Sequence, residues 1–251
     1  MESVAKIDAL GQFELHPVLG AVGEKLHLSQ SPVYMVIACG LVLAFLYLGM
    51  RTKAVVPGRL QSAAEIAYEF VRELAISTIG EKGTAFFPFI FALFFFILAG
   101  NYLGLLPYSF TFTSHIVVTL ALAMVVFIMA IFVAIYNQGF GFFKHFMPAG
   151  APVALAPLLV PVEILSYLSR PISLSIRLFA NMVAGHVLLE VFASFTIMLA
   201  GLGTIGYVLG AAPVVINIAL MGLELVVGGL QAYVFAILTC MYLQEACETT
   251  H

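Results

Sequence analysis

Charged side chains are scarce in this sequence. Of its 251 residues, 9% are Asp, Glu, Lys or Arg and 63% are hydrophobic, and the mean hydropathy is +1.11. Soluble domains carry about 25% charged residues. So few charges cannot cover a surface that faces water on all sides. This composition excludes an ordinary soluble domain and indicates an integral membrane protein.

Residue types and motifs that mark other functions are also missing. The sequence contains no Trp, so an aromatic belt at the membrane surface must come from its 10 Tyr and some of its 22 Phe. Its 3 cysteines have neither the spacing of a disulfide framework nor that of a zinc site, and we expect no metal and no cofactor. No basic patch indicates nucleic acid. No Gly-rich loop followed by Lys and Ser/Thr is present, so we expect this chain to bind no nucleotide.

Apolar runs predict several membrane-spanning helices. A hydrocarbon core about 30 Å thick is crossed by about 20 helical residues. Runs of about that length occupy residues 33–50, 86–106 and 115–136, and two longer runs occupy residues 152–200 and 207–243. Residues 1–31 lack the basic start and apolar stretch of a cleavable signal peptide. We expect them to form an N-terminal segment outside the spans.

Residues 57–82 differ from these runs. Leu60, Ala67 and Leu74 recur at helical spacing, while the charged side chains of this segment lie mostly on another face. The pattern predicts an amphipathic helix that lies on the membrane surface.

The basic residues set the direction in which the chain crosses the membrane. Positively charged residues collect on the cytoplasmic or matrix side. Six of the ten Lys and Arg fall in segments that five spans place on one side: Arg51, Lys53, Arg59, Arg72, Lys82 and Lys144. The sequence therefore predicts an external N-terminal segment and, after five crossings, an internal C-terminus.

The last two apolar runs are too long for upright helices. Residues 152–200 number 49 and residues 207–243 number 37, whereas about 20 suffice. Either each run breaks into two short spans, or each forms one long, tilted helix. Polar residues near the middle are not typical of a loop, which favours a tilted hairpin that turns near Gly201 to Gly206. The expected fold is an all-α membrane protein in a single membrane domain, with about five membrane helices and one interfacial helix.

Polar side chains follow helical spacing inside both long runs. An ionisable side chain within a span costs from about 3 kcal/mol upward, so it indicates function by default. In the first run one face carries a polar stripe of Glu163, Ser166, Arg170, Ser173, Arg177 and Asn181. His186 and Glu190 lie one turn apart on roughly the opposite face. In the second run a face carries Asn217, Glu224 and Gln231 at intervals of seven residues. Two such helices can line a water-filled path.

Arg177 is the most informative of these residues. Arginine stays charged in proteins because its pKa exceeds about 12, so at membrane depth it needs an anionic partner or water. A fixed cation also repels protons and can block a leak. The alternative is an inert buried ion pair between Arg177 and Glu224 or Glu190. His186 has a similar alternative as an interhelical hydrogen-bonding residue, and Arg170 as a structural residue near the membrane surface.

Three motifs resemble one family. The run SLSIRLFANM at 173–182, continued to His186, is similar to the signature of subunit a of F-type ATP synthases. The runs NYLGLLP at 101–107 and GLQAYVF at 229–235 resemble the end of that family's second span and part of its last helix. The resemblance extends over nearly the whole chain.

The resemblance implies roles for the polar residues. Arg177 matches the family's essential arginine, which faces a ring of carboxylate-bearing rotor subunits. Glu224, Gln231, Asn181 and His186 match positions on the path to the external side, and Glu163, Ser166 and Ser173 match positions on the path to the internal side. Some bacterial members carry Glu at the position of His186 and His at that of Glu224, and this exchange suggests that the two residues meet. Glu190 is a candidate only through its place beside His186.

The resemblance also implies a setting. The chain would be a non-catalytic subunit that passes protons, with Na⁺ as an open alternative. Its partners would be a rotor ring of proteolipid c subunits, b-type subunits of a peripheral stalk and the lipid bilayer. Residues 12–17 (QFELHP) resemble alphaproteobacterial forms, which favours a bacterial inner membrane over a mitochondrial inner membrane. A secondary transporter would show internal repeats and a haem carrier would need paired histidines, neither of which we find.

Overall fold

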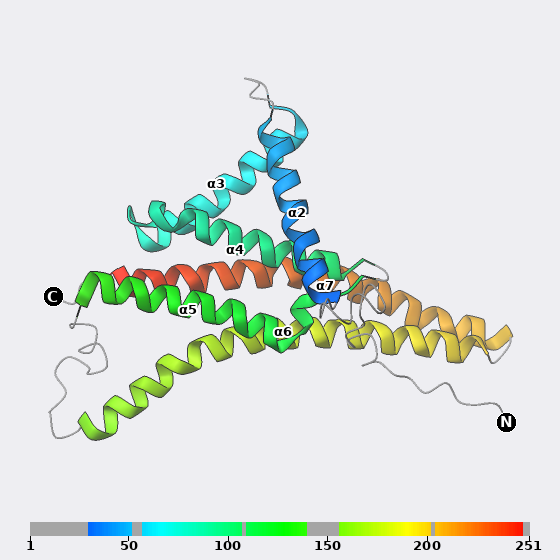
Figure 1. Ribbon diagram of the computed structural model, residues 1–251. Coiled ribbons are helices and arrows are strands. Elements are labelled where there is room, and N and C mark those ends of the chain that lie inside the picture. The colour runs from blue at the N-terminus through cyan, green and yellow to red at the C-terminus, as the bar shows by residue number, and fades with distance from the viewer. Residues whose placement is uncertain (1–29, 52–56, 107–108, 140–155, 202–203, 248–251) are drawn as a thin grey trace, which may run out of the picture. The chain divides into compact units, whose positions relative to one another are not determined.

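The computed structural model describes residues 30–51, 57–106, 109–139, 156–201 and 204–247 (Figure 1). These residues form helices and no strand: α2 (Gln30–Met50), α3 (Arg59–Ile79), α4 (Gly83–Gly104), the 3-10 helix η2 (Phe112–Ser114), α5 (Ile116–Gln138), α6 (Ala156–Ala200) and α7 (Thr204–Cys247). Five helices are long and apolar enough to cross a membrane: α2, α4, α5, α6 and α7. The prediction of an all-α membrane protein is confirmed. Most of the expected N-terminal segment, 1–31, lies outside the described residues.

Each of the two long apolar runs forms one helix rather than two. α6 has 45 residues and α7 has 44. At about 1.5 Å per residue each helix is more than twice as long as the hydrocarbon core is thick. An upright orientation is therefore excluded for both helices in a bilayer of ordinary thickness. α6 ends at Ala200 and α7 begins at Thr204.

α3 is the helix that does not have the composition of a span. Its core-facing side chains Val71 and Leu74 are buried, whereas Glu65 and Glu69 are exposed. α3 ends at Ile79 and is capped by Gly80, whose φ of 82° lies in the left-handed region that favours glycine. The Gly80 N–H donates to the Ile76 carbonyl at 2.9 Å. This turn lets α4 begin three residues later.

The chain folds into two compact units, each assembled from segments far apart in the sequence. The described residues of the first unit fall within Met1–Leu41, Ile97–His115 and Leu178–Gln231, and those of the second fall within Val42–Phe96, Ile116–Arg177 and Ala232–His251. α6 and α7 both contribute to both units. The boundary falls directly after Arg177 in α6 and directly after Gln231 in α7.

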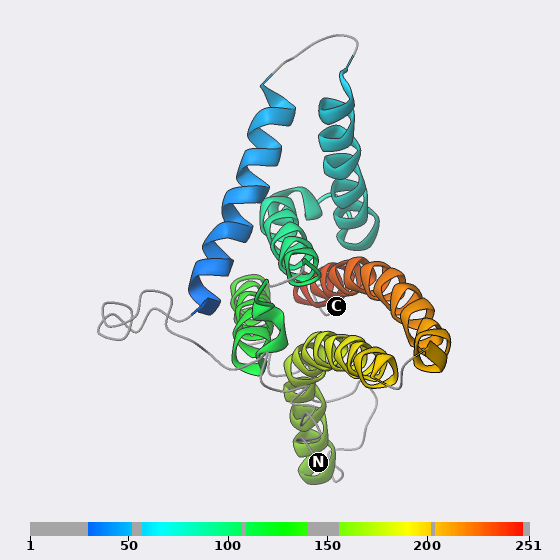
Figure 2. The same cartoon turned by 90° about the vertical axis from the view of Figure 1, so that its right-hand side faces the viewer.

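In the first unit, α4 packs closely against α7. The side-chain amide of Asn101 donates to the Gly228 carbonyl at 2.9 Å, and the Thr113 hydroxyl donates to Asn101 Oδ1 at 3.0 Å. A Cβ atom at Gly229 would lie 2.7 Å from the Tyr102 hydroxyl, so glycine permits this approach. The end of α6 and the start of α7 form a hairpin, drawn in yellow and orange in Figures 1 and 2.

In the second unit, aromatic rings from four helices pack against one another, and two of them, Phe94 and Phe95, are buried. Phe95 on α4 lies 6.4 Å from Phe45 on α2, and Phe70 on α3 lies 5.9 Å from both Phe94 on α4 and Tyr233 on α7, measured between ring centroids. α3 returns beside the second half of α2 (Figure 2). A Cβ at Gly49 of α2 would lie 2.7 Å from the Cβ of Ala64 in α3.

The last turn of α7 is fixed by side chains from α5 and from the turn before α4, both in the second unit. The Asn137 amide donates to the Ala246 carbonyl at 3.4 Å, and Gln138 donates to the Glu245 carbonyl at 3.4 Å. Lys82 Nζ donates to the Cys247 carbonyl at 3.2 Å. Carbonyls at the end of a helix have no partner within the helix, so these three donors satisfy them.

Candidate functional site

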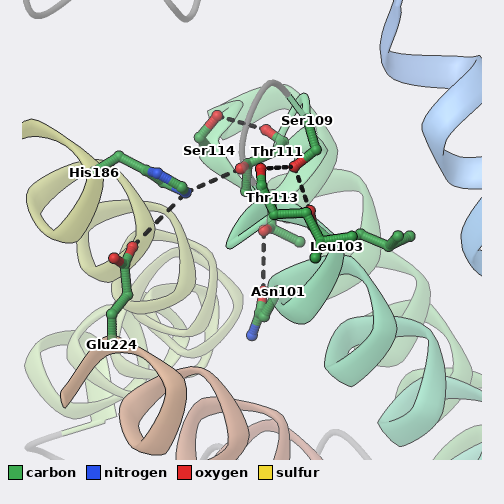
Figure 3. Close-up of polar contacts among 9 residues, drawn as sticks. Asn101, Leu103, Ser109, Thr111, Thr113, Ser114, His186 and Glu224 are labelled. Carbon is green, nitrogen blue, oxygen red and sulfur yellow. Dashed lines mark hydrogen bonds and ion pairs between the residues drawn. The ribbon is translucent and has the colours of Figure 1, made fainter. Parts of the chain in front are cut away.

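The first unit brings His186 of α6 and Glu224 of α7 together. His186 Nε2 lies 3.7 Å from Glu224 Oε1, and their side chains are 12% and 5% exposed (Figure 3). The exchange of these residue types in related sequences had suggested that the two residues meet, and this contact confirms it. Gly185 provides the space, because a Cβ at this position would lie 2.6 Å from Glu224 Oε1.

In the first unit, the polar face of α7 is buried and neighbouring apolar side chains are exposed. Glu224 and Gln231 are buried, whereas Leu223 is 58% exposed and Leu230 is 54% exposed. A spacing of seven residues keeps Glu224 and Gln231 on one side of the helix. This arrangement suits a helix whose outer surface contacts lipid or another apolar helix rather than water.

Four side chains on these two helices carry buried polar atoms without a hydrogen-bond partner among the described residues. The atoms are Asn181 Nδ2, Asn217 Oδ1, both carboxyl oxygens of Glu224, and Gln231 Nε2. Buried polar atoms left unsatisfied cost about 1–3 kcal/mol each, and polar interiors are normally satisfied by water. Their grouping within the first unit favours a hydrated passage along α6 and α7.

A hydroxyl group from outside the two long helices reaches the same site. Thr111 precedes η2, and its Oγ1 lies 2.9 Å from His186 Nε2 (Figure 3). Sequence reasoning missed this residue. Thr111 lies in a connection with no helical period, so its spacing carried no signal. Glu190 lies one turn after His186 on α6 and is half-buried.

The other sequence-predicted residues lie in the second unit, on the first half of α6. Ser166, Ser173 and Arg177 are exposed and Glu163 is half-buried. Arg177 stands near the middle of a 45-residue apolar helix. The alternative of an inert buried ion pair between Arg177 and Glu224 or Glu190 stays a prediction. Within α6 the structure therefore places Glu163, Ser166, Ser173 and Arg177 in one unit, and Asn181, His186 and Glu190 in the other.

Arg170 contacts the last turns of α7 and a ring of its own helix. Its guanidinium forms an ion pair with Glu245 of α7 and lies 5.1 Å from the ring centroid of Tyr167 and 5.6 Å from that of Tyr242. The polar stripe had included Arg170, and its alternative interpretation as a structural residue fits this pair. No pattern in the sequence indicated that Glu245, in the last turn of α7, would pair with Arg170. In the described ranges no group of three or more His, Cys, Asp or Glu is placed to hold a metal ion.

Comparisons with known proteins agree with the motifs. The family model of the ATP synthase A chain matches residues 32–244. ATP synthase subunit a of Gluconacetobacter diazotrophicus is 73% identical, with 98% of this chain and 99% of the relative aligned. The subunit of Gluconobacter oxydans is 72% identical over the same shares, and that of Granulibacter bethesdensis is 57% identical over 98% of both chains. The chain belongs to the ATP synthase A chain family, as a multi-pass, proton-translocating subunit of the membrane sector of an ATP synthase.

Proposed function

We propose that this chain is the stator subunit that leads protons to and from a rotor ring through two offset half-channels, with Arg177 between them. The observation that carries the proposal is the exposed position of Arg177 near the middle of α6. A permanent cation facing hydrocarbon costs from about 3 kcal/mol upward. A carboxylate on a neighbouring subunit would remove this cost, and the ring of proteolipid c subunits would supply one after another.

The first half-channel would open to the external side. Its support is the set of buried polar atoms on Asn181, Asn217, Glu224 and Gln231, together with the His186–Glu224 contact. A His and a Glu 3.7 Å apart can exchange a proton through small movements or one water molecule. The proton would then neutralise a rotor carboxylate, which can enter lipid only in its neutral form.

The second half-channel would open to the internal side, along Glu163, Ser166 and Ser173. The unit boundary after Arg177 supports this division, because it separates these residues from Asn181 and His186 on the same helix. Rotation would bring a protonated rotor carboxyl group to Arg177. An opposite charge lowers the pKa of a carboxyl group, so Arg177 would promote release of the proton into this second path.

The energetics require a partner that rotates. One proton crossing the membrane yields about 2.3 kcal/mol per 100 mV, which is too little to form ATP in a single step. Several crossings must therefore be added together. In this proposal the chain is a non-catalytic subunit that takes no part in the formation of ATP. The b-type subunits of the peripheral stalk would keep it stationary while the rotor turns. The bacterial relatives favour a bacterial inner membrane.

The test is ATP-driven proton pumping in membrane vesicles that contain the complete complex, followed with a pH-sensitive dye. We expect Arg177→Ala to abolish pumping. Arg177→Lys should also fail, because lysine can lose its proton in such a setting. Arg59→Ala removes an exposed cation at the start of α3 and serves as the matched control, with pumping close to that of the wild type. Normal pumping by an assembled Arg177→Ala complex would refute the proposal.

A further inference from the structure

The connection between α4 and α5 is rich in hydroxyl side chains. Thr111, Thr113 and Ser114 are all buried, at 5%, 0% and 4% exposure. The Thr113 hydroxyl donates to Asn101 at 3.0 Å, and the Ser114 hydroxyl donates to the Thr111 carbonyl at 2.5 Å. The Thr111 hydroxyl forms a hydrogen bond with a titratable side chain, that of His186 (Figure 3).

The position of the Thr111 hydroxyl is fixed by the backbone around it. A Cβ atom at Gly104, in the last turn of α4, would lie 2.2 Å from Thr111 Oγ1. The hydroxyl therefore rests directly on the α4 backbone. On the other side, the Thr111 carbonyl accepts both the Ser114 hydroxyl at 2.5 Å and the Ser114 N–H at 3.2 Å. Thr111 is thus held independently of the histidine that it contacts.

Thr111 lies closer to Nε2 of His186 than Glu224 does. His186 Nε2 lies 2.9 Å from Thr111 Oγ1 and 3.7 Å from Glu224 Oε1. Hydrogen bonds of this type have lengths of about 2.7–3.2 Å, so the histidine is bonded to the threonine and only near the glutamate. The contact with Thr111 is therefore the one able to orient the ring directly at this nitrogen.

A hydroxyl group suits a histidine that changes its protonation state. When Nε2 is unprotonated it accepts a hydrogen bond from the Thr111 hydroxyl, and when Nε2 is protonated it donates a hydrogen bond to the Thr111 oxygen. The same bond therefore persists in both states, with only its direction reversed. A carboxylate alone could not do this, because an ionised carboxylate only accepts hydrogen bonds.

We propose that Thr111 is a positioning residue for proton transfer at the His186–Glu224 pair, holding the imidazole in one place through both of its protonation states. This inference rests on the proposed function, because it matters only if protons pass through that pair. Thr111 contributes no proton of its own to the transfer. The Thr111 hydroxyl group keeps its proton, and only the direction of its hydrogen bond with His186 changes.

The experiment compares Thr111→Val with Thr111→Ser in vesicles that contain the complete complex. Val keeps the size and branching of Thr but has no hydroxyl, whereas Ser keeps the hydroxyl and loses a methyl group. We expect Thr111→Val to lower the rate of ATP-driven proton pumping about fivefold, because this is the size of effect that the loss of one hydrogen bond produces. Thr111→Ser should pump within about twofold of the wild-type rate. A packing role would produce the opposite order.

Two matched variants complete the design. Thr239 is fully buried in α7, and its hydroxyl donates to the Phe235 carbonyl of its own helix at 2.8 Å. Thr239→Val therefore controls for the loss of a buried hydroxyl as such, and it should pump normally. Gly104→Ala introduces the Cβ that displaces the Thr111 hydroxyl. It should lower pumping as Thr111→Val does, and it tests the proposal by itself if the valine variant does not assemble.

Glu224→Gln separates the two proposals. If the assembled Glu224→Gln complex pumps like the wild type, the half-channel assigned to Glu224 is wrong, and the role of Thr111 falls with it. If Glu224→Gln fails while Thr111→Val or Gly104→Ala pumps normally, only the role of Thr111 is refuted. A serine variant as impaired as the valine variant also refutes it. Assembly is measured as the amount of this chain in the membrane and the ATPase activity bound there.

Discussion

Replacing Gly185 with Ala should displace the carboxyl group of Glu224. A Cβ at position 185 would lie 2.6 Å from Glu224 Oε1, 2.8 Å from its Cδ and 3.2 Å from its Cγ. Carbon atoms in good contact stand about 3.5–4.0 Å apart, so the carboxyl group must move by roughly 1 Å. A displacement of about 1 Å can cost about a hundredfold in the rate of a positioned reaction. We expect Gly185→Ala to lower proton pumping at least tenfold.

The assay is ATP-driven pumping in vesicles, normalised to the amount of assembled complex. Gly40→Ala is the matched control, because a Cβ at Gly40 on α2 would meet no atom within 4 Å. Alanine is a better helix former than glycine by about 1 kcal/mol, so this control should assemble at least as well as the wild type. Adding Glu224→Asp to Gly185→Ala shortens the acid by one methylene group and should recover part of the pumping.

Two outcomes would refute this reasoning. Pumping at the wild-type rate by Gly185→Ala would show that the position of the Glu224 carboxyl group does not limit proton transfer. Equal losses in Gly185→Ala and in the double variant would show that the defect comes from helix separation and not from the displaced acid.

Two further predictions concern the packing of each unit. Asn101→Leu leaves the Gly228 carbonyl and the Thr113 hydroxyl without their bonds to Asn101, so we expect a loss of about 2–3 kcal/mol in stability, measurable as a lower midpoint of thermal inactivation. In the Arg170–Glu245 pair, the side chains are 26% and 40% exposed, so the coupling free energy in a double-mutant cycle should be at most about 1 kcal/mol. A coupling of several kcal/mol would contradict the partly exposed geometry, and unchanged inactivation of Asn101→Leu would contradict the first prediction.

The long-range architecture was predictable where the sequence is periodic. The lengths of the last two apolar runs exceed one span, and their unbroken polar spacing favoured single helices, as α6 and α7 are. The meeting of His186 with Glu224 followed from the exchange of residue types between related sequences. Periodicity also placed Glu224 and Gln231 on one face, and both are buried.

The contacts that periodicity does not govern could not be predicted. Thr111 contacts His186 from a connection between helices, where the conformation of the backbone rather than a repeat decides which way a side chain points. Glu245 pairs with Arg170 across 75 residues of sequence. The division into two units is likewise a property of packing between distant segments. Helical spacing predicted one polar stripe from Glu163 to Asn181, but the boundary between the two units falls within that stripe.

The interleaved segments of the two units have a consequence for biogenesis. Asn101 bonds to a carbonyl 127 residues further along the chain, and Lys82 to one 165 residues further along. A ribosome makes α4 well before it makes α7, so the NH2 group of the Asn101 side chain enters the bilayer before its acceptor, the Gly228 carbonyl, has been synthesised. A polar amide in hydrocarbon without a partner costs several kcal/mol. Until α7 is released, the early spans must therefore remain beside the insertion machinery or another polar surface. Insertion of α7 is then the event that allows the whole chain to leave the insertion machinery.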